Sequence, residues 1–306
     1  MDDIIHKGLK RKVVIVGAGL VGSTYAYSLS QSGLADEIVL IDRNEELVKG
    51  QVLDLVHGEA FVPTVSIREG SSEDYADAQL IVITAGSAQK PGETRLQLLK
   101  KNADIVGSIA GEVSRQGSKG VMLIVSNPVD VMTWVALKSS GWERGRVIGS
   151  GTVLDSARFR YLLAKHCGID VHNVHAYILG EHGDSEFAAW SMTNVAGMVI
   201  DNYCPVCKKC SDWKSERTII EQQVRESAYH IINAKGATHF AVGLAMVRIT
   251  AAILRKQNSV MTVSVFLNGE FGLRDVCLSV PSIVTNTGVT RVIAGPLSDQ
   301  EMKSLR

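Results

Sequence analysis

Short apolar segments alternate with longer amphipathic segments over the first half of the chain. The amphipathic segments are long enough for helices, and the apolar segments have the length of buried strands. Strands that alternate with helices are typical of a parallel, doubly wound sheet with helices on both faces. The pattern predicts such an α/β domain over residues 1–149. Its expected strands are residues 13–16, 38–41, 65–67, 80–83, 121–125 and 147–148.

The pattern changes after Gly149, and a second domain of α+β type is expected over residues 150–306. Its last part contains several β-rich runs separated by Asn-Gly and Gly turns, which indicates a small antiparallel sheet. The expected elements are a helix that starts at Gly151 and ends before Gly168, an alternating strand over residues 174–179, helices over residues 215–256 with a break near Gly236, and the antiparallel sheet over residues 259–295.

A glycine-rich turn follows the first predicted strand in G-x-G-x-x-G spacing, with glycines at 17, 19 and 22. Gly17 allows the tight turn, Gly19 lets backbone N–H groups approach a pyrophosphate, and Gly22 lets the helix pack close to the strand. Asp42 ends the second predicted strand, where a carboxylate binds the adenosine ribose and repels a 2′-phosphate. The stretch predicts a Rossmann-type domain that binds NAD rather than NADP.

Composition narrows the class of protein further. Of 306 residues, 45% are hydrophobic and 21% charged, and the formal net charge is zero. This balance gives no reason to expect a nucleic-acid or anionic-membrane partner. No apolar run approaches the ~20 residues that a membrane-spanning helix needs. The five cysteines are an odd number, which does not favour a secreted disulfide framework, so a cytoplasmic protein is expected.

Three of those cysteines, Cys204, Cys207 and Cys210, form a C-x-x-C-x-x-C cluster. Such spacing can bind zinc or an iron–sulfur cluster, but both usually need a fourth ligand. No histidine lies nearby in the sequence. We therefore expect a surface loop that carries thiols, and no metal site.

A few polar residues of the second half could carry chemistry. Asp155 and Arg158 are three apart on the predicted helix and share a face, whereas Arg160 must point elsewhere. His182 lies between glycines at a strand end, where an aspartate on one ring nitrogen would prepare it for proton transfer. The alternatives are a surface ion pair and a solvent-exposed histidine.

The polar segment 87–95, with a turn at Pro91-Gly92, follows the third strong strand. It is either a solvated connection or a lid that closes over a substrate.

Several motifs together resemble the bacterial L-lactate dehydrogenases of the lactate/malate dehydrogenase superfamily. The resemblance runs in order from about Arg11 to the C-terminus. The motifs are the glycine turn, residues 84–86 leading to residues 89–95, Ser126-Asn127-Pro128-Val129-Asp130, Leu154-Asp155-Ser156-Ala157-Arg158, and Gly180-Glu181-His182-Gly183-Asp184-Ser185.

The resemblance implies roles for these residues in the reduction of pyruvate by NADH. His182 would give a proton to the carbonyl oxygen, and Asp155 would hold His182. Arg158 would clamp the substrate carboxylate through a bidentate contact, and Arg95 would polarise the carbonyl. The implied substrate-binding residues are Gln89, Arg95, Asn127, Arg158 and Thr238. The implied cofactor-binding residues are Gly17, Gly19, Val21, Gly22, Asp42, Gly86, Ser108, Asn127 and Ser150.

Malate dehydrogenases of the same superfamily are the nearest alternative, together with enzymes for other L-2-hydroxy acids. A malate enzyme carries an arginine where this chain has Gln89, and an unpaired second carboxylate beside a neutral amide would be costly. A more distant alternative is a nucleotide-binding module that has lost catalysis. Such a module would be expected to lack one of Arg95, Asp155, Arg158 and His182, and all four are present.

The resemblance also suggests regulation. Lactate dehydrogenases activated by fructose 1,6-bisphosphate carry an arginine and a histidine at the positions that match Arg160 and His175. In those enzymes the sites of two subunits meet across a two-fold axis. The resemblance therefore implies a homotetramer with fructose 1,6-bisphosphate as activator. Binding of the activator would favour the high-affinity state of the enzyme.

Overall fold

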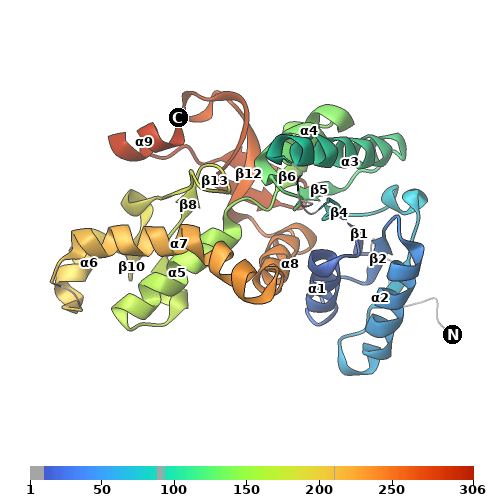
Figure 1. Ribbon diagram of the computed structural model, residues 1–306, viewed down its shortest axis with the longest axis horizontal. Coiled ribbons are helices and arrows are strands. Elements are labelled where there is room, and N and C mark those ends of the chain that lie inside the picture. Colours follow the sequence, from blue (N-terminus) through green and yellow to red (C-terminus); the bar gives the residue numbers. More distant parts are fainter. Residues whose placement is uncertain (1–9, 88–91, 93, 210) are drawn as a thin grey trace.

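The computed structural model describes residues 10–87, 92, 94–209 and 211–306. Helices and strands alternate in the first half of the chain, except that a short 3-10 helix instead of an α-helix separates β3 from β4 (Figure 1). The elements there are β1 (Lys12–Val16), α1 (Leu20–Ser30), β2 (Glu37–Ile41), α2 (Glu45–His57), β3 (Ser66–Glu69), β4 (Leu80–Ile83), α3 (Arg95–Arg115), β5 (Val121–Ile124), α4 (Val129–Ser140) and β6 (Val147–Gly149).

The second half mixes helices with short strands and ends in a β-hairpin region and a C-terminal helix. Its elements are α5 (Val153–Cys167), β7 (Val174–His175), β8 (Ile178–Leu179), β9 (Phe187–Ala188), β10 (Asn194–Val195), β11 (Met198–Val199), α6 (Ile200–Cys207), α7 (Trp213–Lys235), α8 (Phe240–Leu254), β12 (Ser259–Asn268), β13 (Arg274–Thr285), β14 (Gly288–Val292) and α9 (Asp299–Leu305).

A nine-stranded sheet forms the centre of the molecule, in the order β14-β13-β12-β6-β5-β4-β1-β2-β3. Strands β1 to β6 pair in parallel, and the order β3-β2-β1-β4-β5-β6 is that of the doubly wound nucleotide-binding fold. The predicted α/β class and the predicted strands of the first half are confirmed. The division between residues 149 and 150 stays a prediction.

Side chains of the central strands alternate between two cores. Val13 and Ile15 of β1 pack with α1 and α8 on one face, whereas Val14 and Val16 pack with α3 and α4 on the other. Figure 1 shows these two helix layers above and below the sheet. A parallel sheet covered on both faces needs apolar residues at consecutive positions, which explains the uninterrupted apolar runs in the sequence.

The antiparallel strands expected near the C-terminus are present, but they extend the main sheet instead of forming a separate one. Ser264 of β12 pairs with Gly149 of β6, and β13 and β14 follow. The expected single strand over residues 174–179 is wrong. It is interrupted at residues 176–177, so that β7 pairs with β10 and β8 pairs with β9.

The cysteine cluster is not the surface loop that we expected. Cys204 and Cys207 lie in helix α6, and Cys204 is buried, at 2% exposure. Cys210 lies outside the described residues. The apolar face of α6 packs toward the core and buries Cys204. The spacing of the cysteines could not indicate this burial.

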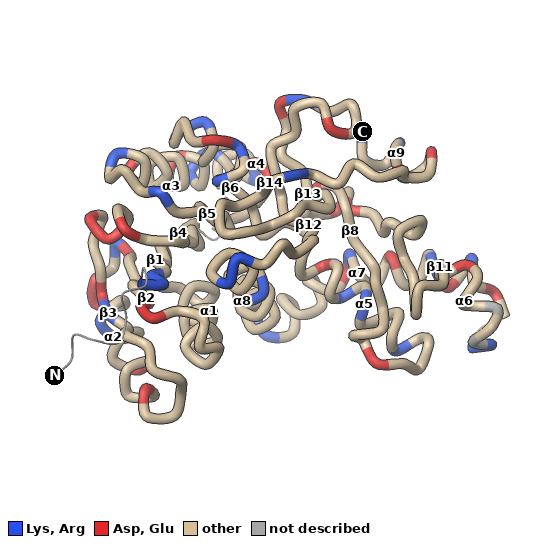
Figure 2. The backbone as a smooth tube through the Cα atoms, turned by 180° about the vertical axis from the view of Figure 1, so that it is seen from behind, with Lys and Arg blue, Asp and Glu red and all other residues tan. Residues whose placement is uncertain are grey.

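Charges of both signs are dispersed along the elements (Figure 2). Within the described part of the chain, no helix combines the length and the apolar character that crossing a membrane requires.

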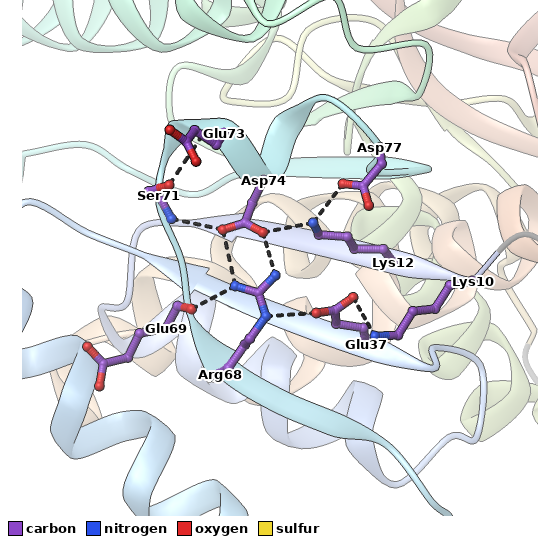
Figure 3. A network of polar contacts seen from close by, with 9 residues as sticks. All are labelled: Lys10, Lys12, Glu37, Arg68, Glu69, Ser71, Glu73, Asp74 and Asp77. Carbon is purple, nitrogen blue, oxygen red and sulfur yellow. Dashed lines mark hydrogen bonds and ion pairs between the residues drawn. The ribbon is translucent and has the colours of Figure 1, made fainter. Parts of the chain in front are cut away.

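A network of ion pairs joins three parallel strands at their outer edge (Figure 3). Lys12 of β1 is buried and donates to Asp74 at 2.8 Å and to Asp77 at 2.7 Å. Arg68 of β3 pairs with Asp74 and with Glu37 of β2. Burial opposes ionisation of Asp74, but Arg68 and Lys12 outweigh it and hold the pKa of that carboxyl well below its usual range.

We expect Lys12→Met to destabilise the protein, because it leaves Asp74 buried with one cation fewer. The cost should be about 2 kcal/mol, less than for a fully orphaned buried charge because Arg68 remains. The measurement is the midpoint of urea unfolding followed by circular dichroism.

Lys49→Met is the matched control, since Lys49 forms an exposed pair with Glu46 on α2 and should shift the midpoint little. Equal midpoints for wild type and Lys12→Met would contradict the stabilising role of this network.

Candidate active site

A cavity of about 870 Å³ lies at the carboxyl ends of β1, β2 and β4. In a sheet of this topology, this edge is where ligands bind. Five of the nine cofactor-binding residues named from the sequence line it, together with Thr84 of the motif at residues 84–86 and with Tyr75, which the sequence analysis did not single out. The five are Gly17, Gly19, Asp42, Gly86 and Ser108.

The glycine turn has the geometry that a dinucleotide site requires. Gly17 has φ +111°, and a Cβ on Gly22 would lie 1.8 Å from the carbonyl oxygen of Gly17. No atom lies within 4 Å of the Cβ position of Gly19, so the backbone there is open to an approaching ligand. Helix α1 starts next to it with no side-chain cap and no acid in its first turn, which leaves N–H donors for a phosphate.

Asp42 accepts hydrogen bonds from the backbone N–H groups of Ala18 at 2.8 Å and Asn44 at 3.0 Å. These contacts fix the carboxylate at the rim of the cavity, where it can meet a ribose. The turn, the open helix start and the placed acid fit a dinucleotide such as NAD. Val21, Gly22, Asn127 and Ser150 do not line this cavity.

Helix α5 positions the candidate catalytic groups, and the start of α5 is fixed by the sheet. The backbone N–H of Thr152 donates to Thr262 of β12 at 3.1 Å. The hydroxyl of Thr152 donates to the carbonyl of Ile178 at 2.5 Å. Ile178 lies in β8, the strand that directly precedes the turn of His182. The first turn of α5 and this turn are therefore held side by side.

The ring of His182 donates from Nδ1 to Asp155 Oδ2 at 2.7 Å, and Arg158 Nη1 donates to Asp155 Oδ1 at the same distance. The Asp155 side chain is 2% exposed and that of Arg158 14%. The arrangement is a His–Asp–Arg cluster around a buried carboxylate. A surface ion pair between Asp155 and Arg158 is wrong, and His182, whose side chain is 28% exposed, is bonded to Asp155.

Each charged group of the cluster stabilises the ionised form of its neighbour. Burial disfavours the imidazolium, but the hydrogen bond and charge of Asp155 outweigh burial and raise the pKa of His182 to about 9. Burial would raise the pKa of Asp155, but His182 and Arg158 keep it below its ordinary value. At neutral pH, His182 is therefore protonated, and its Nδ1 is the nitrogen bonded to Asp155.

Asp130 fixes the backbone of the turn that carries His182, a role that the sequence analysis did not assign. Its Oδ2 accepts from the backbone N–H of His182 at 2.8 Å, and its Oδ1 accepts from the hydroxyl of Ser264 at 2.5 Å. Its location in the first turn of α4, directly after Asn127, was the available signal. Glu186, a buried acid at the other end of the same turn, was also missed.

A second cavity, of about 460 Å³, is lined by Arg158 and Thr238. It brings together two of the five residues predicted to bind substrate. Asn127 follows β5, and its carbonyl accepts from Asn102 of α3 at 3.0 Å. Arg95 is exposed at the start of α3, and no contact of the described residues joins it to His182. Gln89 lies outside the described residues.

Arg160 points away from the catalytic cluster, as its helical spacing predicts. Its Nε donates to the carbonyl of Ala176 at 3.1 Å, beside the exposed His175 on β7. A cavity of about 400 Å³ is lined by Arg160 and by Arg248 of α8, a cation that the sequence analysis did not single out. Burial, and then the charge of Arg248, lower the pKa of Arg160.

Comparisons with known proteins agree over the whole chain. Residues 11–149 match the family model of the lactate/malate dehydrogenase NAD-binding domain, and residues 152–306 match that of the lactate/malate dehydrogenase α/β C-terminal domain. An L-lactate dehydrogenase of Treponema denticola is 59% identical, over 97% of this chain and 94% of the relative. L-lactate dehydrogenase 1 of Clostridium acetobutylicum is 50% identical, over 96% and 94%.

Among solved structures, the minor L-lactate dehydrogenase of Enterococcus mundtii in its ligand-bound form has a TM-score of 0.94 and is 43% identical. The alignment covers 97% of this chain and 95% of that structure. Family models that span both halves, and near-full-length relatives at these identities, leave one assignment: this chain belongs to the lactate/malate dehydrogenase family, among its NAD-dependent bacterial L-lactate dehydrogenases.

Proposed function

We propose that this chain catalyses the reversible transfer of hydride between NADH and pyruvate, giving L-lactate, with His182 as proton donor and acceptor. The observation that carries the proposal is the His182–Asp155–Arg158 cluster, in a chain whose cavity at the carboxyl ends of β1, β2 and β4 fits a dinucleotide. When bound, the nicotinamide supplies the hydride. The protein's own residues bind the keto acid, exclude water and deliver the proton.

Each member of the cluster has a distinct task. His182, which is protonated at neutral pH, donates its proton to the carbonyl oxygen of pyruvate and takes it back from lactate. Asp155 fixes the ring by its bond to Nδ1, so that the other nitrogen faces the substrate. Arg158 gives one donor to Asp155, and its remaining donors form the planar fork that a carboxylate requires.

Four further residues complete the substrate site in this proposal. Arg95 reaches the substrate from the start of α3 and stabilises the developing alkoxide, and Asn127 hydrogen-bonds the same oxygen. Thr238 lines the pocket beside Arg158. Gln89 faces the methyl group of pyruvate and disfavours a second carboxylate.

The remaining cofactor residues follow the same assignment. Gly17, Gly19, Val21 and Gly22 form the phosphate turn, and Asp42 binds the ribose. Gly86, Ser108, Asn127 and Ser150 are assigned to cofactor binding as well. The zero net charge and the odd number of cysteines support the further proposal that the enzyme acts in the cytoplasm.

A homotetramer activated by fructose 1,6-bisphosphate is the regulatory part of the proposal, with Arg160 and His175 as activator site. The contact of Arg160 with the residue after His175 supports it, and so does the nearby second cation, Arg248. Like charges that crowd at a subunit interface favour binding of a polyanion, which neutralises them. Arg160 and Arg158 lie on the same helix, so an activator at one face can move the substrate clamp at another.

A steady-state assay with NADH and purified protein tests the proposed reaction. Pyruvate should have the highest kcat/KM among pyruvate, oxaloacetate and longer 2-keto acids. A higher value for oxaloacetate would favour malate dehydrogenase activity instead.

For the His–Asp pair, we expect wild-type pyruvate reduction to persist at neutral pH and to fall as pH rises through about 9, because His182 must be protonated. Asp155→Asn removes the charge that raises this pKa, so the alkaline limb moves to lower pH. Turnover should also fall by a factor on the order of 10²–10⁴. The measurement is kcat/KM for pyruvate between pH 5.5 and 10. An unmoved limb would disprove the pairing.

For substrate choice, we expect Gln89→Arg to shift preference from pyruvate toward oxaloacetate, since it supplies a cation to the second carboxylate. Gln89→Leu is the control, because it removes the amide without adding a charge and should bring no gain with oxaloacetate. If kcat/KM for oxaloacetate is the same in Gln89→Arg as in wild type, Gln89 does not face the substrate.

For regulation, the KM of wild type for pyruvate should fall when fructose 1,6-bisphosphate is added, and Arg160→Gln should abolish this response. Lys165→Gln, an exposed cation on the same helix, should retain it. Analytical ultracentrifugation of each protein reports the oligomer. Identical saturation curves for wild type with and without the activator would refute the site, as would activation that survives loss of Arg160.

A further inference from the structure

Glu186 is a buried carboxyl beside the His182–Asp155 pair, and the proposed mechanism gives it no task. It closes the turn that begins at Gly180, and its backbone N–H donates to Gly183 at 3.2 Å. One oxygen of Glu186, one of Asp155 and one ring nitrogen of His182 all lie within 4.8 Å of one another. The residue is 5% exposed. A third titratable group therefore faces the His–Asp pair at close range.

The position of Glu186 is fixed from helix α7. Arg225 donates to the backbone carbonyl of Glu186 at 3.3 Å and to the carboxylate of Glu221 at 3.0 Å. Glu221 in turn accepts from the indole of Trp190 at 3.3 Å. Because Arg225 is already paired with Glu221, it is not a dedicated counter-ion for the Glu186 side chain.

The charged groups around Glu186 come from every element packed against it. Helix α5 contributes Asp155 and Arg158, the catalytic turn contributes His182, and α7 contributes the Arg225–Glu221 pair. Asp130 of α4 lies behind His182. Burial, and then the negative charge of Asp155, raise the pKa of Glu186 to about 8, against the opposing effect of His182 and Arg158.

The charge of the pocket depends on whether Glu186 holds a proton. With Glu186 neutral, the charged groups nearest to it, the cations Arg158 and His182 and the anion Asp155, sum to one net positive charge, which suits a monocarboxylate. Asp130 is bonded to the backbone N–H of His182 and to Ser264 instead. Ionised Glu186 removes that excess. It also stabilises the imidazolium, so the pKa of His182 and the pKa of Glu186 are coupled.

We propose that Glu186 acts as a neutral acid beside His182 and Asp155. In this form it leaves the net positive charge that one substrate carboxylate needs, and it acts through the neighbouring His182 and Asp155 without touching the reacting atoms. Substrate binding then requires two protons in the pocket, one on His182 and one on Glu186. This proposal rests on the proposed role of His182 as the catalytic acid.

The first test is the pH profile of kcat/KM for pyruvate reduction, which reports groups of the free enzyme. Above pH 9, log(kcat/KM) of wild type should fall with a slope approaching about two, because two protons are lost. Glu186→Gln should give a slope of about one, with each profile normalised to its own value at pH 6.5. Glu186→Asp keeps the carboxyl and should restore the steeper slope.

Glu226→Gln is the matched control, since the side chain of Glu226 on α7 is 47% exposed. Its profile should superimpose on that of wild type. A wild-type slope of about one, or equal slopes for wild type and Glu186→Gln, would overturn the role of Glu186 and leave the role of His182 intact. The absence of any alkaline limb in wild type would overturn the role of His182 itself.

A second test uses wild type alone and does not depend on the folding of a variant. Oxamate, an amide isostere of pyruvate, is titrated into the enzyme–NADH complex at pH 9.5 in buffers of different ionisation enthalpy. Uptake of more than one proton per subunit supports two titrating groups. Uptake of one proton or less would show that His182 acts without Glu186.

Discussion

The contact between β6 and β12 is the constraint on which the active site depends. Where the parallel strands end, Gly149 pairs with Ser264, and the chain then begins α5 almost at once. Thr152 is bonded to both β12 and the strand that precedes the catalytic turn. The Asp155 carboxylate and the His182 ring come from segments that are 27 residues apart in the chain. They meet because Thr152, at the start of α5, is bonded both to β12 and to β8, the strand that precedes the turn of His182.

Two carboxylates near His182 are buried away from water, and each has partners for both of its oxygens. Asp130 and Asp155 are both buried, and an unpaired buried carboxylate would be costly. Asp130 has both oxygens occupied, by a hydroxyl and by a backbone N–H, and Asp155 has two cations. The two acids therefore differ in chemistry: Asp130 fixes the backbone of the turn, and Asp155 sets the protonation of its histidine.

Much of the fold could be predicted from the sequence because the apolar runs and glycines act locally. The strands of the doubly wound half and the helix that carries Asp155 and Arg158 follow directly from period and spacing. The interruption between β7 and β8, the burial of Cys204 in α6 and the joining of β12 to β6 depend on distant partners. No local pattern encodes those contacts.

The site divides in the same way. His182, Asp155 and Arg158 could be named because glycines and helical spacing single them out. Asp130 and Glu186 resemble ordinary acids at a helix start and before a strand, and only their burial beside His182 distinguishes them. The contribution of Arg248 to the cavity of Arg160 likewise needs the packing of α8 on α5.

The unbroken sheet has a mechanical consequence. In many two-domain enzymes, closure is a rotation about a flexible connection between the domains. Here the nine strands share one hydrogen-bonded ladder across the junction, and such a rotation would break it. Motions that accompany turnover must therefore be carried by elements outside the ladder. Helix α5 is one such element, and it carries Arg158, the proposed substrate clamp, on one face and Arg160 on another. A small displacement of α5 at the surface near Arg160 would therefore also move Arg158, while the strands of the sheet keep their positions.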